Sequence, residues 1–176
     1  MSFSLKELLS ELRKDPENAI TEEQIQEMLK ENQENADNYH YLDDKTASTI
    51  KKDVHDCIYG MDCINQEQKE SLVQKLQGWR YMEDLRDYKP QQIVRMVKKD
   101  TGKLSLPMVG LDVKFTRLGT NIKCKYIRSP AKYLEYGIDR YYVFQKITTQ
   151  EYFVLLAKEY TETTDEINDP ISQTVD

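Results

Sequence analysis

The chain has 176 residues and a mass of 20.8 kDa, enough for one domain or for one small domain with a helical extension. Its 25 basic and 31 acidic side chains give a formal charge of −6, and no apolar run of about 18 residues occurs, which excludes a membrane-spanning helix. The N-terminus lacks the pattern of a signal peptide, and three cysteines do not make a disulfide framework, so we expect an intracellular protein, cytoplasmic or nuclear.

Residues 1–38 predict two short docking helices followed by a polar linker. Ser4 with Glu7, and Thr21 with Gln24, fit capping boxes, in which each side chain bonds to the backbone of the other residue. Apolar residues follow each box at helical spacing. The apolar stripes are too narrow to stabilise such short helices in isolation, so this pair must pack on the rest of the chain or on another protein.

Residues 39–89 predict a further helical segment that packs on the β-domain. One helix is expected over residues 43–60, where a glycine ends it. The next is expected to begin at Asn65, which fits a capping box with Gln68. The apolar residues after Gly78 predict that a short helix continues to about residue 87.

Beyond Pro90 the apolar period drops to two, which predicts strands. The strands are expected at residues 93–99, 111–116, 122–126 and 141–147. Gly119-Thr120 suits a type II′ turn and predicts a hairpin between the second and third of these strands. Thr148 and Glu151 fit a third capping box, which predicts a helix from there to about residue 160.

The order of these elements predicts an α+β fold. A helical N-terminal half precedes a small antiparallel barrel or half-barrel of the SH3 or Tudor type, closed by a C-terminal helix. The alternative is a sheet backed by the helices. The predicted parts are docking helices with a linker (1–38), a helical segment on the β-domain (39–89), the β-domain with its closing helix (90–160) and a disordered acidic tail (161–176).

Residues 85–160 carry short hydrophobic motifs in a recognisable order. They are Leu85 and Tyr88 leading to Ile93-Val94-Arg95, then Leu104-Ser105 before a strand, and the aromatic strand Tyr142-Val143-Phe144. This region resembles a small β-domain recurrent in proteins of large nucleocytoplasmic DNA viruses. The resemblance implies a viral protein made in an infected cell and located in the host cell or the virion. It implies no functional residues.

Histidine and cysteine gather only around His55, Cys57 and Cys63. Zinc sites need about four ligands at short spacings, and this group does not supply them. His55 and Cys57 are two positions apart, which places them on different faces of a helix and argues against a local catalytic pair. No nucleotide-binding, nucleophile-elbow or zinc-protease motif occurs. We therefore predict no catalytic residue, no metal, no cofactor and no small-molecule substrate.

The charge is divided unevenly along the chain. Residues 1–76 have nine basic and 17 acidic side chains, residues 77–160 have 16 and nine, and residues 161–176 have none and five. The basic candidates lie on or beside predicted strands: Arg117, Lys123, Lys125, Arg128, Lys132 and Arg140, interleaved with tyrosines such as Tyr133. Cations match phosphates, and tyrosine rings offer faces for bases. Lysines on a strand also deter edge-to-edge aggregation, so an ordinary solvated surface is the alternative.

Two hypotheses for function follow. The first is a non-enzymatic interaction or assembly protein whose amphipathic helices dock protein partners or other copies of the chain. The second is a nucleic-acid-binding accessory protein that uses the basic, tyrosine-bearing strands. Trp79, the sole tryptophan, is expected either to pack the helices on the sheet or to anchor a partner. Neither hypothesis involves a membrane.

Overall fold

The computed structural model describes residues 36–129, 132–155 and 158. The chain divides into two compact units, one of residues 1–48 and 148–176 and the other of residues 49–147. The predicted helices of residues 1–38, with the capping boxes at Ser4 and Thr21, and the acidic tail lie outside the described residues, apart from residues 36–38. Among the described helices, none combines the length and apolar character needed to cross a membrane.

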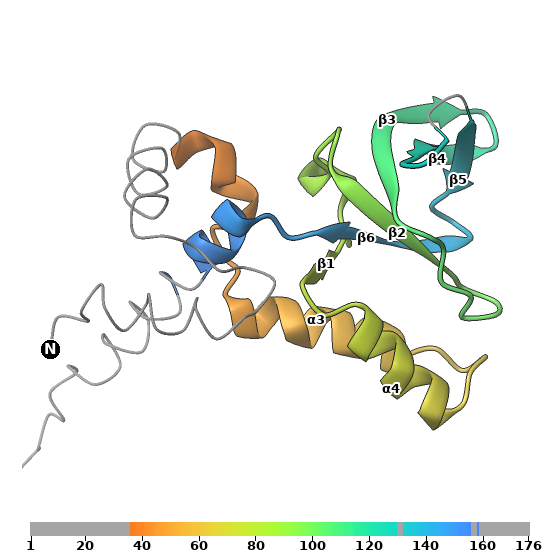
Figure 1. Ribbon diagram of the computed structural model, residues 1–176, viewed down its shortest axis with the longest axis horizontal. Coiled ribbons are helices and arrows are strands. Elements are labelled where there is room, and N and C mark those ends of the chain that lie inside the picture. The colour runs from red at the N-terminus through yellow and green to blue at the C-terminus, as the bar shows by residue number, and fades with distance from the viewer. Residues whose placement is uncertain (1–35, 130–131, 156–157, 159–176) are drawn as a thin grey trace, which may run out of the picture. The chain divides into compact units, whose positions relative to one another are not determined.

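Unit 49–147 contains an antiparallel sheet and helices, so the α+β class is confirmed (Figure 1). The helices are α3 (Ala47–Tyr59), whose first two residues precede the unit boundary, α4 (Gln66–Lys75) and the 3-10 helix η2 (Leu85–Asp87). The strands are β1 (Trp79–Tyr81), β2 (Ile93–Lys98), β3 (Met108–Thr116), β4 (Gly119–Tyr126), β5 (Tyr133–Gly137) and β6 (Tyr141–Lys146). Their order in the sheet is β1-β6-β2-β3-β4-β5.

Short sequence patterns account for the position of the two α-helices of this unit. α3 buries Ile50, Val54 and Ile58 along one stripe and ends at the residue before Gly60, as predicted. It begins at Ala47, a few residues later than the sequence indicated. The capping box of α4 is confirmed: Asn65 Oδ1 accepts from the Gln68 backbone N–H at 2.9 Å, and Gln68 Oε1 accepts from the Asn65 N–H at 3.0 Å.

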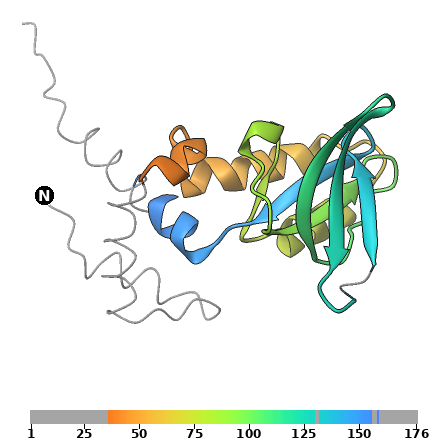
Figure 2. The same cartoon turned by 90° about the horizontal axis from the view of Figure 1, so that it is seen from above.

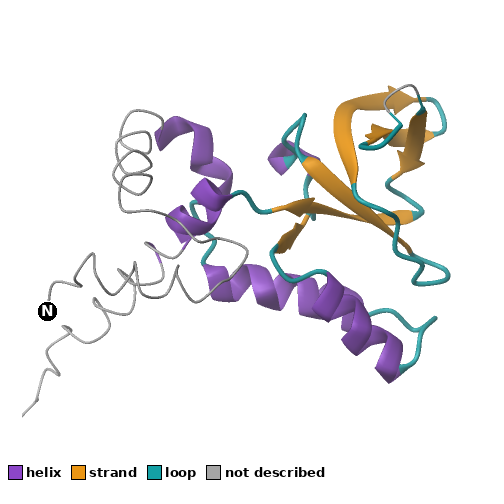
Figure 3. Ribbon diagram, viewed as in Figure 1, coloured by secondary structure: helices purple, strands orange, loops and turns teal. Residues whose placement is uncertain are grey.

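The sheet has a different core on each of its faces. On the face that we call the outer face, Trp79, Val97 and Phe144 pack with the apolar stripes of α3 and α4. On the opposite, inner face, residues of β2, β3, β4 and β6 meet in one cluster, which includes Met96 and Ile122. Strands that are not neighbours in the sheet share this inner core, so the sheet curls around it. Figure 2 shows this curvature, and Figure 3 shows α3 and α4 beside the sheet.

The bend in β3 depends on Gly110. The pairing of β3 with β4 is irregular between Gly110 and Val113. A Cβ atom at Gly110 would overlap the hydroxyl of Tyr88 and lie 2.9 Å from Val94 Cγ1. That hydroxyl donates to the carbonyl of Leu111 at 3.1 Å. Glycine therefore lets the strand approach Tyr88 closely, while the irregular pairing turns β4 and β5 over the inner core.

Several local predictions need correction. Trp79–Tyr81 is a strand and not a helix, because Gly78 has a φ of +74° and β1 pairs with β6. The hairpin loop is residues 117–118 and not Gly119-Thr120, since Thr116 pairs with Gly119. The short strand β5 was not predicted. A closed barrel is not confirmed, because the sheet is open with β1 and β5 at its ends.

In unit 1–48 and 148–176, the described residues are 36–48, 148–155 and 158. η1 (Ala36–Leu42) is a 3-10 helix, and residues 149–155 are helical. The capping box of Thr148 and Glu151 is confirmed, with the Thr148 N–H donating to Glu151 Oε2 at 2.6 Å and the Glu151 N–H donating to Thr148 Oγ1 at 3.2 Å. This helix is grouped with residues 1–48 and not with the sheet, so its predicted role in closing the β-domain is not confirmed.

Candidate functional site

The outer face of β4 carries lysines because the strand alternates. Ile122 and Cys124 are fully buried in the inner core. Successive side chains of a strand point to opposite faces, so Lys123 and Lys125 lie on the outer face. The register opposes Lys123 to Glu135 and Lys125 to Tyr133. Helices α3 and α4 pack on the outer face at β1, β6 and β2, whereas these side chains of β4 and β5 are half-buried or exposed.

Tyr133 brings an aromatic ring to the same face. Its side chain is 54% exposed, among the larger values for an apolar residue of the described chain. The Lys123 ammonium lies over the ring, 4.5 Å from its centroid. A cation over an aromatic face is attracted by the electron density of that face. Tyr133 and Lys123 therefore form one contact unit that combines a planar ring with a positive charge.

One ion pair lies within this face. The register opposes Lys114 to Asn121, and Lys114 Nζ lies 2.6 Å from Glu135 Oε1. The hydrogen bond from Lys114 lowers the pKa of Glu135, so the carboxyl group stays ionised at neutral pH. The positive charge of Lys114 and the negative charge of Glu135 cancel each other. We use the name "basic outer face" for Lys114, Asn121, Lys123, Lys125, Tyr133 and Glu135 together.

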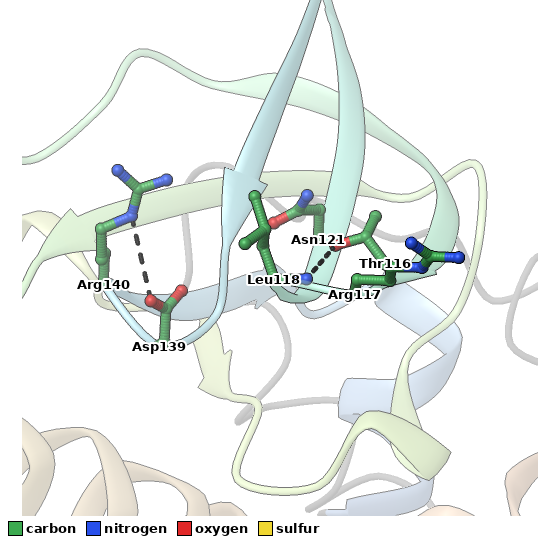
Figure 4. Close-up of a pocket in the computed structure, with 6 residues that line it drawn as sticks. All are labelled: Thr116, Arg117, Leu118, Asn121, Asp139 and Arg140. Atoms are coloured by element: carbon green, nitrogen blue, oxygen red, sulfur yellow. Dashed lines mark hydrogen bonds and ion pairs between the residues drawn. The ribbon is translucent and has the colours of Figure 1, made fainter.

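Two of the predicted arginines line a recess at one end of this face. A recess of about 700 Å³ is lined by residues that include Arg117, Leu118, Asn121, Asp139 and Arg140. Figure 4 shows the guanidinium groups of Arg117 and Arg140 on either side of Leu118 and Asn121. Asp139 is 4.0 Å from Arg140 and largely exposed, so it compensates little of the charge. Asn121 connects this recess to the basic outer face.

The other end of the face is the connection between β4 and β5. Arg128 and Lys132 lie in this loop, and both are exposed. Between Asp112 and Glu135 the chain has six basic residues and no acidic residue. A stretch of this composition over a hairpin and a loop produces a positive potential, which attracts anions.

Trp79 lies away from the basic outer face. It is 8% exposed and packs in the core between the helices and the sheet. The Arg95 guanidinium lies over its ring at 5.3 Å. The packing role expected from the sequence accounts for this placement, and a ring so deeply buried has little surface to offer a partner.

The histidine and cysteine group is dispersed around α3. The His55 ring stacks on Tyr59 at 3.9 Å, and its Nδ1 atom is 3.2 Å from Asp56. Burial raises the pKa of Cys57 to about 12, so its thiol stays protonated at neutral pH. Cys63 is exposed and donates to the Lys99 carbonyl. Within the described residues, no group of three or more histidine, cysteine or acidic side chains is placed to hold a metal.

Lys114, Asn121 and Glu135 were not among the predicted site residues. The alternation of residues 111–116 was visible in the sequence, but the predicted turn at Gly119 gave a different register. With the loop at residues 117–118, Lys114 lies opposite Asn121 and joins the face. Glu135 lies on β5, which was not predicted.

Comparisons with known proteins give no relative. No family model, no curated protein and no solved structure matches the chain. The resemblance of residues 85–160 to a viral β-domain therefore stays a prediction.

Proposed function

We propose that this protein is a non-enzymatic, nucleic-acid-binding accessory protein that contacts a strand through its basic outer face. The observation that carries the proposal is the common placement of Lys123, Lys125 and Tyr133 on the half of the sheet that α3 and α4 leave uncovered. Lysines neutralise backbone phosphates, and an exposed tyrosine ring offers a stacking surface for a base. The recess of Arg117 and Arg140 lies at one end of this path.

The charge pattern supports an anionic partner over a neutral one. Glu135 pairs with Lys114 and lies opposite Lys123 in the register. The chain between Asp112 and Glu135 has four further basic residues and no acidic one. The acidic balance of the remaining chain repels nucleic acid, which argues against an autonomous binder and favours an accessory protein that acts with others.

The test is the salt dependence of binding. The full chain is titrated into a labelled dT oligonucleotide, and fluorescence anisotropy is recorded at about 50 and 200 mM salt. If four cations contact phosphates, affinity for a single strand falls about 50-fold over this range. Replacing Lys123 and Lys125 together by alanine removes two contacts and reduces the fall to about sevenfold.

The matched control replaces Lys51 and Lys52, an exposed lysine pair on α3, by alanine. This variant loses the same charge from a different surface, so its binding should follow that of the natural protein. Absence of binding at low salt would contradict the proposal. Equal losses in both double variants would mean that the total charge, and not the basic outer face, governs binding.

A second candidate function is protein assembly. Phe115 and Leu118, at the tip of the β3–β4 hairpin, are 81% and 96% exposed. Large apolar side chains exposed together suit a protein contact. Sedimentation of the full chain over a range of concentrations tests self-association, which replacement of both residues by serine should abolish. A monomer at every concentration would contradict assembly by self-association.

An intracellular location belongs to the same proposal. Cys57, Cys63 and Cys124 are all free thiols. Free thiols are typical of proteins in a reducing compartment. A host-cell or virion location would follow from the viral resemblance.

A further inference from the structure

A second concave region lies on the inner side of the sheet, where several strands end. Tyr126 is the last residue of β4, Tyr141 the first of β6, and Tyr136 is near the end of β5. These three rings line a groove of about 650 Å³ that is open to solvent, with the fully buried Met96 beneath them. We call it the tyrosine groove. Its volume lies within the range of sites that bind small organic groups.

The rings are partly buried and positioned by contacts. Tyr126, Tyr136 and Tyr141 pack against the inner core without being fully covered by it. Tyr136 and Tyr141 lie at right angles, with centroids 5.0 Å apart. Burial raises the pKa of Tyr136 to about 12, so its hydroxyl group stays a donor at neutral pH. The groove thus offers aromatic surfaces with hydroxyl groups near them, which suits a planar polar ring.

The rim of the groove is positive. Lys98 and Lys103 line it, together with Thr101 and Ser105, and no acidic residue does. Lys98 forms an ion pair with Asp100 at 2.9 Å. Lys103 is exposed and forms no ion pair with a described residue. An occupant with a planar apolar part and an adjoining anion matches both the rings and Lys103.

We propose that the tyrosine groove receives one unstacked base of a single-stranded nucleic acid, with the adjoining phosphate at Lys103. The inference rests on the proposed function and adds a site for one base of the strand. Tyr126 is followed directly by the loop that carries Arg128 and Lys132. A strand whose base occupies the groove therefore meets further cations that a free nucleotide would not reach.

The test uses the full chain and a dT oligonucleotide with a single 2-aminopurine. The fluorescence of this base falls when it stacks on an aromatic ring, whereas anisotropy reports binding by any surface. Replacing Tyr126 or Tyr141 by leucine should remove the fluorescence change and weaken single-strand binding about tenfold. Binding to duplex DNA should not change, because a paired base cannot enter the groove. Tyr59→Leu on α3 is the matched control and should behave like the natural protein.

Lys103→Glu tests the groove without touching the packed rings. It should weaken single-strand binding several-fold, whereas Lys51→Glu, the same charge reversal on α3, should have a much smaller effect. Circular dichroism of each variant verifies folding. If the tyrosine variants do not fold, the comparison of Lys103→Glu with Lys51→Glu still tests the groove, since equal effects of the two variants would contradict the inference.

The outcomes separate this inference from the proposed function. If the double alanine variant of Lys123 and Lys125 loses binding while the groove variants bind normally with an unchanged fluorescence signal, the groove inference is wrong and the proposed function stands. If the natural protein binds no oligonucleotide, both are wrong. Competition by thymidine monophosphate as effective as that by the strand, or binding of a labelled oligo-glutamate peptide in place of the oligonucleotide, would also overturn the groove inference.

Discussion

The two halves of the sheet differ in what covers them. The half made of β1, β6 and β2 has the inner core on one face and α3 with α4 on the other. The half made of β3, β4 and β5 curls over the same inner core, and its other face carries Lys123, Lys125 and Tyr133. Among the described residues, the first half is covered on both faces, whereas the second half has one face that α3 and α4 leave uncovered. The difference locates the candidate interface without any motif.

The largest effect is expected from the covered half. Phe144 is fully buried between the sheet and the helices, so Phe144→Ala should lower the free energy of unfolding by about 3–5 kcal/mol. The matched control is Phe115→Ala, the same change at an exposed position of β3, which should cost less than about 0.5 kcal/mol. Urea unfolding measures both. A similar loss of unfolding free energy at the two positions would contradict the difference between the covered and the uncovered half of the sheet.

A smaller effect is expected at the bend between the halves. Gly110→Ala places a methyl group against the Tyr88 hydroxyl and Val94 and should cost about 1–3 kcal/mol. Tyr88→Phe removes the hydroxyl group, so the double variant should recover part of that loss. A double-mutant cycle in urea measures the coupling. Additive costs would mean that the hydroxyl group does not limit the bend.

The smallest effect is expected on the basic outer face. Glu135→Gln removes the carboxylate of the basic outer face, and it should raise single-strand affinity by about two- to threefold, the scale of one exposed charge pair. The anisotropy titration described above measures it. A loss of affinity would mean that Glu135 positions Lys114 for the ligand.

The same variant gives a pH dependence with a defined sign. Lys114 lowers the pKa of Glu135 in the folded state, so the pair contributes stability at neutral pH and loses it as the pH falls through that lowered pKa. The melting temperature of Glu135→Gln should therefore lie slightly below that of the natural protein at neutral pH, and the difference should vanish in acid. If the difference in melting temperature does not depend on pH, the packing of the Glu135 side chain, and not its charge, causes it.

The sequence predicted those elements whose structure depends on residues close to them along the chain. The capping boxes at Asn65 and Thr148 and the alternation in β4 are of this kind. β1 was missed because its three residues are held as a strand by pairing with β6, about 65 residues later. The recess of Arg117 and Arg140 depends on the pairing of β4 with β5, which places Asn121 opposite Gly137, and β5 was not predicted.

We propose that the half of the sheet that α3 and α4 leave uncovered is the contact surface. Its most direct test is a nuclear magnetic resonance titration of the isotope-labelled full chain with a dT oligonucleotide. We expect the amide signals of residues 121–126 and 133–137 to shift most, while those of α3 and α4 stay in place. Shifts confined to α3 and α4, or none in β4 and β5 at an oligonucleotide concentration that saturates the anisotropy change, would contradict it.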